Sequence, residues 1–144
     1  SGVPASRYAN FLPGVFRSAT CPAGAPGALF YRLTATATGN GRGILGGAEM
    51  QLRAGGVSQP IQFIRADSQF SGAEIGFLVD GSNSTIYSSA DGSMPETISV
   101  KLANKAQVNE LLWTARNDGF ANDSMTAATL AVSDDNVNFS TSVT

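Results

Sequence analysis

Runs of alternating apolar and polar residues recur along this chain from residue 28 onward, and they constrain its fold more than any other feature. In residues 30–38, FYRLTATAT, Tyr31 and Leu33 alternate with Arg32 and Thr34. A period of two residues places successive side chains on opposite faces of a β-strand. Similar short runs occupy residues 44–54, 61–66, 86–89, 97–103, 108–116, 129–133 and 137–141. The pattern therefore predicts one strand after another.

Short turn sequences separate these predicted strands. They are GNGRG (39–43), AGGVSQP (54–60), NKAQ (104–107) and SDDN (133–136), made of residues that bend the chain readily. The segment SGAEIGFLV (71–79) has a helical pattern of at most two turns. A length of 144 residues, with 16 glycines and 14% charged residues, suits one all-β domain. We therefore predict an antiparallel β-sandwich over residues 28–144.

Residues 1–27 differ from the rest of the chain. They hold four of the six prolines and show no sustained period, so they cannot form a central strand. They are nevertheless too apolar for a plain flexible linker. We predict an irregular N-terminal docking arm that lies on a partner or on another copy of the chain. Its expected contact residues are Arg7, Tyr8, Phe11, Leu12, Val15, Phe16 and Arg17.

Catalytic and metal-binding chemistry has few candidates in this sequence. The chain has no histidine and one cysteine, Cys21, so a Ser-His or Cys-His pair cannot form and zinc lacks its preferred ligands. The run SDDNVNF begins like a calcium loop, but its sixth residue is Phe139 where such a loop needs glycine. A hairpin turn fits that run better. We predict no enzymatic activity, no cofactor and no bound metal.

Two classes of partner are also disfavoured. No cluster of Lys and Arg with interleaved aromatic residues appears along the sequence, which argues against nucleic acid. No stretch approaches eighteen consecutive apolar residues, so membrane insertion is not expected. The opening SGVPASRYAN lacks the basic and then apolar regions of a signal peptide.

Three stretches of the sequence carry a family resemblance. They are FYRLTATAT followed by GGAEMQLRA, then ADSQFSGAEIGFLVDGSNSTIYSS, and last VNELLWTARNDGFANDSMTAATLAVSDDNVNFST. In this order they resemble the opening hairpin, the middle segment and the ending of the discoidin-like, galactose-binding-like sandwiches attached to bacteriophage tail proteins. The likeness covers roughly residues 28–141. It departs from the family pattern where Ile86-Tyr87 and Phe139 replace two tryptophans, and the proline-rich arm has no counterpart.

The resemblance implies a jelly-roll sandwich with Leu111, Trp113 and Ala115 in its core. It implies a tight turn at Asp80-Gly81 and a hairpin turn at Asp134-Asp135. The two-residue period likewise assigns Trp113 to the core, although a place in a ligand platform is the alternative.

A sugar site in such a sandwich would use the loops at one end, where a flat aromatic ring and planar polar groups hold a pyranose. Arg116 follows the inward Ala115 and is expected to point away from the core. The alternative is that Arg116 pairs with a surface acid such as Asp118. The candidate ligand-binding residues are Arg116, Asn117, Asp118, Phe120, Tyr87 and Asp67.

The leading functional hypothesis is a non-enzymatic structural and interaction protein of a bacteriophage virion, as a capsid decoration, neck or tail accessory protein. Its partners would be other virion proteins or its own copies, reached through the arm. Such a protein would be made in the bacterial cytoplasm without a signal peptide and located in the virion. The alternative hypothesis is a carbohydrate-recognition domain that binds host cell-surface glycans.

Overall fold

The computed structural model describes residues 15–16, 27–39, 43–82, 84–90, 94–108, 110–116, 118, 120, 123–137 and 140–141. Among the residues singled out from the sequence, Arg7, Tyr8, Phe11, Leu12, Arg17, Cys21, Asn117 and Phe139 lie outside this part. For Val15 and Phe16 the backbone alone is described.

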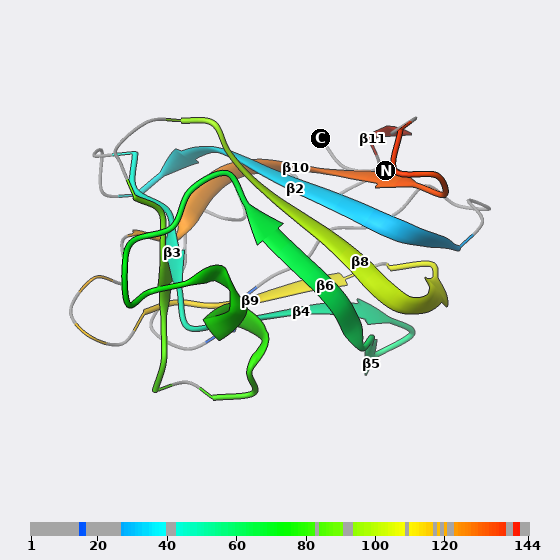
Figure 1. The fold of residues 1–144 in the computed structure, drawn as a ribbon, viewed down its shortest axis with the longest axis horizontal. Helices are drawn as coiled ribbons and strands as arrows, with labels where there is room; N and C mark the ends of the chain where they lie inside the picture. Colours follow the sequence, from blue (N-terminus) through cyan, green and yellow to red (C-terminus); the bar gives the residue numbers. More distant parts are fainter. Residues whose placement is uncertain are drawn as a thin grey trace.

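A five-stranded antiparallel sheet forms one layer of the fold (Figure 1). Its strands, in spatial order, are β11 (Ser140–Thr141), β10 (Met125–Ser133), β2 (Ala28–Thr38), β8 (Glu96–Ala106) and β6 (Ile61–Ala66). The alternation in β2 predicted which face is buried: Tyr31, Leu33 and Ala35 point into the core, while Arg32 and Thr34 are more exposed.

A four-stranded sheet forms the second layer, ordered β1 (Val15–Phe16), β9 (Glu110–Thr114), β4 (Glu49–Ala54) and β5 (Val57–Ser58). A short pair, β3 (Gly46–Gly47) with β7 (Tyr87–Ser88), lies beside the two sheets. The 3-10 helix η2 (Ile75–Val79) contacts β4 of one sheet and β6 of the other. The predicted all-β, antiparallel sandwich is thus confirmed, as is a helical piece of at most two turns. No helix in the described ranges is long and apolar enough to span a membrane.

Side chains from both sheets fill one continuous core. Trp113 and Leu111 of β9 belong to the same core cluster as Ile98 and Val100 of β8, and all four are at least 96% buried. Burying an apolar side chain of this size contributes about 1.5–3 kcal/mol to stability before the entropy of ordering is subtracted. Ala115 is also buried. The core assignment of Leu111, Trp113 and Ala115 is therefore confirmed.

The predicted turn at residues 104–107 is wrong, because β8 continues to Ala106. The buried hydroxyl of Tyr31 explains the later turn. It donates a hydrogen bond to the Ala106 carbonyl and accepts one of 3.2 Å from the Val108 amide. The connection between β8 and β9 is thereby fixed beyond Ala106.

Two residues of the N-terminal segment pair with the outer edge of β9. Val15 lies opposite Thr114, and Phe16 lies opposite Trp113. An edge position is the one that a proline-rich segment can take, since proline has no amide hydrogen to give to a second neighbour. The predicted boundary between residues 27 and 28, and the docking role of the arm, stay predictions.

Candidate functional site

A pocket of about 300 Å³ lies where the β3–β7 pair meets the connection between β9 and β10. Its walls come from three segments far apart in the sequence: Ile44, two residues before β3; the segment from Phe70 to Ala90, which includes β7; and the connection after β9. The lining residues are Ile44, Phe70, Ala73, Ile86, Ser88, Ser89, Ala90, Arg116, Phe120 and Asp123.

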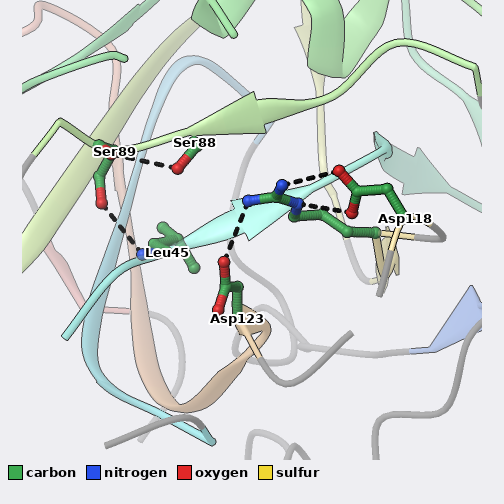
Figure 2. A network of polar contacts seen from close by, with 6 residues as sticks. Leu45, Ser88, Ser89, Asp118 and Asp123 are labelled. Atoms are coloured by element: carbon green, nitrogen blue, oxygen red, sulfur yellow. Dashed lines mark hydrogen bonds and ion pairs between the residues drawn. The ribbon is translucent and has the colours of Figure 1, made fainter. Parts of the chain in front are cut away.

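Arg116 is held in this pocket by two carboxylates. Its Nε and Nη2 donate to the two oxygens of Asp118 at 3.0 and 2.7 Å, and its Nη1 donates to Oδ2 of Asp123 at 3.1 Å. Figure 2 shows Asp118 and Asp123 reaching the guanidinium from different sides. A guanidinium has five N–H donors. Within the described part of the chain, these contacts leave one N–H on each terminal nitrogen of Arg116 for a ligand.

The two carboxylates lie in different surroundings. The side chain of Asp123 is 1% exposed, whereas that of Asp118 is 43% exposed. The pKa of Asp118 is lowered, chiefly by its hydrogen bonds with Arg116. Asp118 is therefore ionised at neutral pH. The ion pair with Asp123 is shielded from water, while the pair with Asp118 faces it.

Two exposed phenylalanines form the apolar part of the site. The Cζ atom of Arg116 lies 4.6 Å from the centre of the Phe120 ring, a cation–π distance. Phe120 is 45% exposed and Phe70 is 58% exposed. The backbone of Phe70 is fixed, since its amide donates to the Ser88 carbonyl at 2.8 Å and its carbonyl accepts from the Ala73 amide at 2.8 Å. The rim of the pocket thus carries apolar surface on a fixed backbone.

The glycines of β3 allow the walls to approach each other. A Cβ atom on Gly46 would lie 2.7 Å from Cδ of Arg116 and 3.3 Å from Cβ of Asp123. On Gly47 it would lie 2.6 Å from the Trp113 ring. Glycine within a strand often marks such a close approach. Gly46 and Gly47 were visible within the run of residues 44–54, but the sequence alone did not show which side chains they approach.

Hydrogen bonds through the β7 segment connect the pocket wall to the interior. The Ser89 hydroxyl accepts the Leu45 amide at 3.0 Å (Figure 2). The Ser68 hydroxyl accepts the Ala90 amide at 3.1 Å and donates to Oε2 of Glu96 at 3.0 Å. Glu96 is 2% exposed, and burial is the main cause of its raised pKa. This network holds residues 88–90 in place.

The structure brings together three of the predicted site residues, Arg116, Asp118 and Phe120. The predicted alternative, that Arg116 pairs with Asp118, is confirmed. Arg116 itself lines the pocket, and Asp118 holds it from outside the lining. Sequence reasoning missed Asp123, Phe70 and the Ser88–Ala90 segment, because no local pattern links them to Arg116.

Tyr87 and Asp67 do not belong to this pocket. Tyr87 is fully buried, and its hydroxyl donates to the Ser68 carbonyl at 3.0 Å. In β7 the Tyr87 side chain is part of the core and not of the pocket lining, and its ligand-binding role stays a prediction. Asp67 is exposed at the end of β6, where its carboxylate accepts the Thr97 amide at 3.0 Å. The role of Asp67 is thus to fix the β6–β8 edge.

A second pair of carboxyl groups lies away from the pocket. Oε2 of Glu49 accepts the Gly81 amide at 3.2 Å, while its buried Oε1 has no partner among the described residues. Burial, followed by the nearby charge of Asp80, raises the pKa of Glu49 to about 7. The pKa of Asp80 is lowered, mainly by the Thr85 hydroxyl. Glu49 therefore titrates near neutral pH.

Neither carboxyl pair resembles a metal site. In the described ranges, no three His, Cys, Asp or Glu side chains gather around a common point. The SDDN segment joins β10 to β11 as a turn: the Ser133 hydroxyl accepts the amides of Asp135 and Asn136 at 3.2 and 3.0 Å. Asn136 has a φ of 61°, as such turns require. The hairpin-turn interpretation is confirmed.

Comparison with known proteins gives one family match. The family model described as F5/8 type C domain matches residues 63–144, which is more than half of the chain. The matched region begins in β6 and includes η2, β7, β8, β9, β10 and β11. It therefore contains every pocket-lining residue except Ile44. None of the curated proteins compared with the chain matches it.

Proposed function

Since this chain belongs to the F5/8 type C domain family, whose members are carbohydrate- and ligand-binding interaction modules, we propose that it is a non-enzymatic carbohydrate-binding domain. The pocket around Arg116 is its sugar site. One observation carries this proposal: a guanidinium held by two carboxylates and two exposed aromatic rings line the same pocket of about 300 Å³.

The arrangement matches what a pyranose needs. A sugar presents an apolar face of C–H groups and a rim of hydroxyls, so it binds where an aromatic surface adjoins fixed donors and acceptors. Phe70 and Phe120 supply the aromatic surface. The terminal N–H groups of Arg116 supply donors, and the carboxylate of Asp118 supplies acceptors. Because Arg116 is already held by Asp118 and Asp123, little side-chain entropy is lost when a ligand binds.

Charge and size narrow the ligand class. Counted as formal charges, Arg116, Asp118 and Asp123 together carry one net negative charge, which disfavours an anionic sugar. A volume of about 300 Å³ lies at the lower end for ligand pockets. A neutral mono- or disaccharide, or the end of a longer neutral glycan, is the ligand class that fits.

Carboxylate chemistry supports binding rather than hydrolysis. A glycosidase needs a carboxylic acid whose raised pKa keeps it protonated near neutral pH. In this pocket the pKa of Asp118 is lowered. The two carboxyls with raised pKa, Glu49 and Glu96, do not line the pocket. The sequence also contains no histidine to act as a general base.

The virion role remains a separate prediction. The family match supports the discoidin-like part of the original resemblance and carries no information about a phage particle. Docking through residues 1–27, with other virion proteins or further copies as partners, therefore rests on the sequence alone. A carbohydrate-binding domain is compatible with several locations, including the surface of a particle.

The proposal can be tested by replacing Phe70 or Phe120, because both side chains are exposed and their removal leaves the core intact. A panel of neutral glycans identifies the tightest ligand, and calorimetry then compares the chain with Phe70→Ala and Phe120→Ala. We expect each substitution to weaken binding about three- to tenfold, the range for one aromatic contact of about 0.5–1.5 kcal/mol. Phe63→Ala is the matched control, since Phe63 is 59% exposed but lies on β6 outside the pocket. Absence of any neutral-glycan binding, or equal losses for all three variants, contradicts the proposal.

A further inference from the structure

Glu96, the first residue of β8, is a buried carboxyl that reaches the wall of the Arg116 pocket through one intervening side chain. It is 2% exposed and does not itself line the pocket. Its Oε2 accepts hydrogen bonds from the amide and the hydroxyl of Ser68, at 2.9 and 3.0 Å. The hydroxyl of Tyr87 lies 3.3 Å from the same oxygen. One carboxyl oxygen thus contacts two other segments of the chain.

The Ser68 hydroxyl has a defined orientation in this network. A hydroxyl has one hydrogen to donate. That of Ser68 is donated to Glu96, while the hydroxyl oxygen accepts the Ala90 amide at 3.1 Å. The Ser68 amide can only donate. Both groups of Ser68 therefore need Oε2 of Glu96 as an acceptor, and an ionised carboxyl is an acceptor only. The hydrogen bonds are those of ionised Glu96.

Ala90 is the residue of the pocket wall that this network holds. Its two predecessors in the wall are held by the segment that contains β3: Ser88 lies in the β3–β7 ladder, and the Ser89 amide donates to the Leu45 carbonyl at 2.8 Å. Figure 2 shows Ser88 and Ser89 on this side of the pocket. Ala90 lies beyond the end of β7, and its amide bonds to the Ser68 side chain. The buried carboxyl behind Ser68 therefore acts on the wall at Ala90.

The ionisation of Glu96 sets how firmly Ser68 is held. A hydrogen bond to a charged acceptor is roughly twice as strong as one between neutral groups. With Glu96 ionised, the Ser68 hydroxyl is directed at the carboxylate and keeps a lone pair for the Ala90 amide. Protonation of Glu96 replaces both charge-assisted bonds from Ser68 by neutral ones. Ala90 is then held less firmly, and so is this side of the pocket.

Among the described residues, the ionisable side chains that face Glu96 are Asp67, at the end of β6, and Tyr87 of β7. Its register partner on β2 is the apolar Ala35. Burial is the main cause of the raised pKa of Glu96, and the charge of Asp67 raises that pKa further. The pKa of Asp118, by contrast, is lowered. Acidification therefore protonates Glu96 at a higher pH than Asp118.

We propose that Glu96 is a positioning residue of the saccharide site, which holds Ala90 in the pocket wall through the Ser68 hydroxyl and does so most firmly when ionised. This inference rests on the proposed saccharide-binding function of the Arg116 pocket. Affinity for a neutral saccharide is complete above the pKa of Glu96 and decreases as the pH falls through it. Because linkage is reciprocal, a bound saccharide lowers the pKa of Glu96. Acidification therefore favours release of the saccharide.

A pH titration of the full, isotope-labelled chain without saccharide tests the link between Glu96 and the wall. Nuclear magnetic resonance follows the backbone amides of Ser68 and Ala90. We expect both amides to shift with one common midpoint above pH 4.5, the ordinary pKa of a glutamate. Glu96→Gln removes this step at both amides, and Ser68→Ala removes it at Ala90. Asp67→Asn moves the midpoint to lower pH, because it removes a negative charge near the carboxyl.

Calorimetry at several pH values then measures saccharide affinity, with lactose, maltose and cellobiose as neutral probes. For the probe that binds most tightly, we expect affinity to fall about three- to tenfold as the pH falls through the midpoint, the loss of about one hydrogen bond. Glu96→Gln and Ser68→Ala should bind weakly at every pH and show no step. Glu49→Gln is the matched control and should keep the step, since Glu49 also has a raised pKa but does not line the pocket. The melting temperature of each variant shows whether it is folded.

Three results overturn the inference. The first is an Ala90 amide whose titration is the same in the wild type and in Glu96→Gln. The second is a wall that follows Glu96 while saccharide affinity stays constant with pH. The third is loss of the affinity step in Glu49→Gln, which would assign the step to another carboxyl. Failure of every neutral saccharide to bind at any pH contradicts the proposed function, and with it a role of Glu96 in binding. The titration without saccharide distinguishes that failure, because it still reports whether the wall follows Glu96.

Discussion

The substitutions Asp118→Asn and Asp123→Asn show which of the two carboxylates contributes more to holding Arg116 in the pocket. Asp118 makes two hydrogen bonds to the guanidinium, at 2.7 and 3.0 Å, and Asp123 makes one, at 3.1 Å. A count of hydrogen bonds therefore predicts that Asp118→Asn is the more costly change. Burial predicts the opposite, because the Asp123 side chain is 1% exposed and that of Asp118 is 43% exposed.

The expected free energies favour the prediction made from burial over the prediction made from the number of hydrogen bonds. An exposed ion pair contributes about 0.2–1 kcal/mol, because water and salt screen it. A shielded hydrogen bond to a charged group contributes about 1.5–3 kcal/mol, and Arg116 keeps Asp118 as a partner when Asp123 is changed. We therefore expect Asp123→Asn to lower the free energy of unfolding by about 1.5–3 kcal/mol. Asp118→Asn should lower it by about 0.2–1 kcal/mol.

Urea denaturation followed by tryptophan fluorescence measures both variants, since Trp113 is the one tryptophan of the chain and is buried. With a slope of about 2 kcal/mol per M, the midpoint should fall by about 0.8–1.5 M for Asp123→Asn and by about 0.1–0.5 M for Asp118→Asn. A larger fall for Asp118→Asn would refute the reasoning. It would mean that the outer, solvent-facing pair holds Arg116 in place.

Three further predictions concern the core, pH dependence and the arm. Trp113→Ala should lower the free energy of unfolding by about 3–5 kcal/mol, because the side chain is 1% exposed; a melting temperature unchanged within a degree or two would contradict its core position. The pKa of Glu49 is raised from 4.5 to about 7 in the folded state. Between pH 4.5 and about 7, folded Glu49 therefore keeps a proton that unfolded Glu49 has lost. Stability should therefore fall as pH rises through that window. Glu49→Gln should remove this slope and raise the melting temperature at pH about 8; melting curves that keep the wild-type slope would show that another group titrates. Deleting residues 1–27 should leave a folded sandwich that no longer assembles into particles or oligomers, as chromatography and reconstitution would show; a truncated chain that assembles like the full one would rule out docking through the arm.

Much of the fold was predictable because it depends on local periodicity. The alternation in β2, β4 and β8 assigned the buried faces correctly, and the two-residue period placed Trp113 inward. The apolar faces of a sandwich impose this pattern on each strand separately. Turn residues likewise marked most strand ends. The exception is the end of β8, where the Tyr31 hydroxyl, distant in sequence, fixes the connection.

The candidate site was predictable only where its residues are neighbours in sequence. Arg116, Asp118 and Phe120 lie within five residues, so one loop suggested all three. Asp123 bonds to Arg116 where Gly46 approaches both side chains, and Phe70 lines the same pocket from a distant segment. The burial of Tyr87 was not predictable, because a strand of two residues gives too short a pattern to show which side chain points inward.

The central claim is that the pocket around Arg116 binds a neutral saccharide. The most direct measurement is a nuclear magnetic resonance titration of the isotope-labelled chain with the tightest neutral glycan, observing the backbone amides and the Nε–H of Arg116. We expect the largest shifts at the Arg116 Nε–H and at the amides of Ser88, Ser89, Ala90 and Phe120. Saturable binding whose shifts lie elsewhere on the sandwich, with the Arg116 resonance unmoved, would contradict the claim.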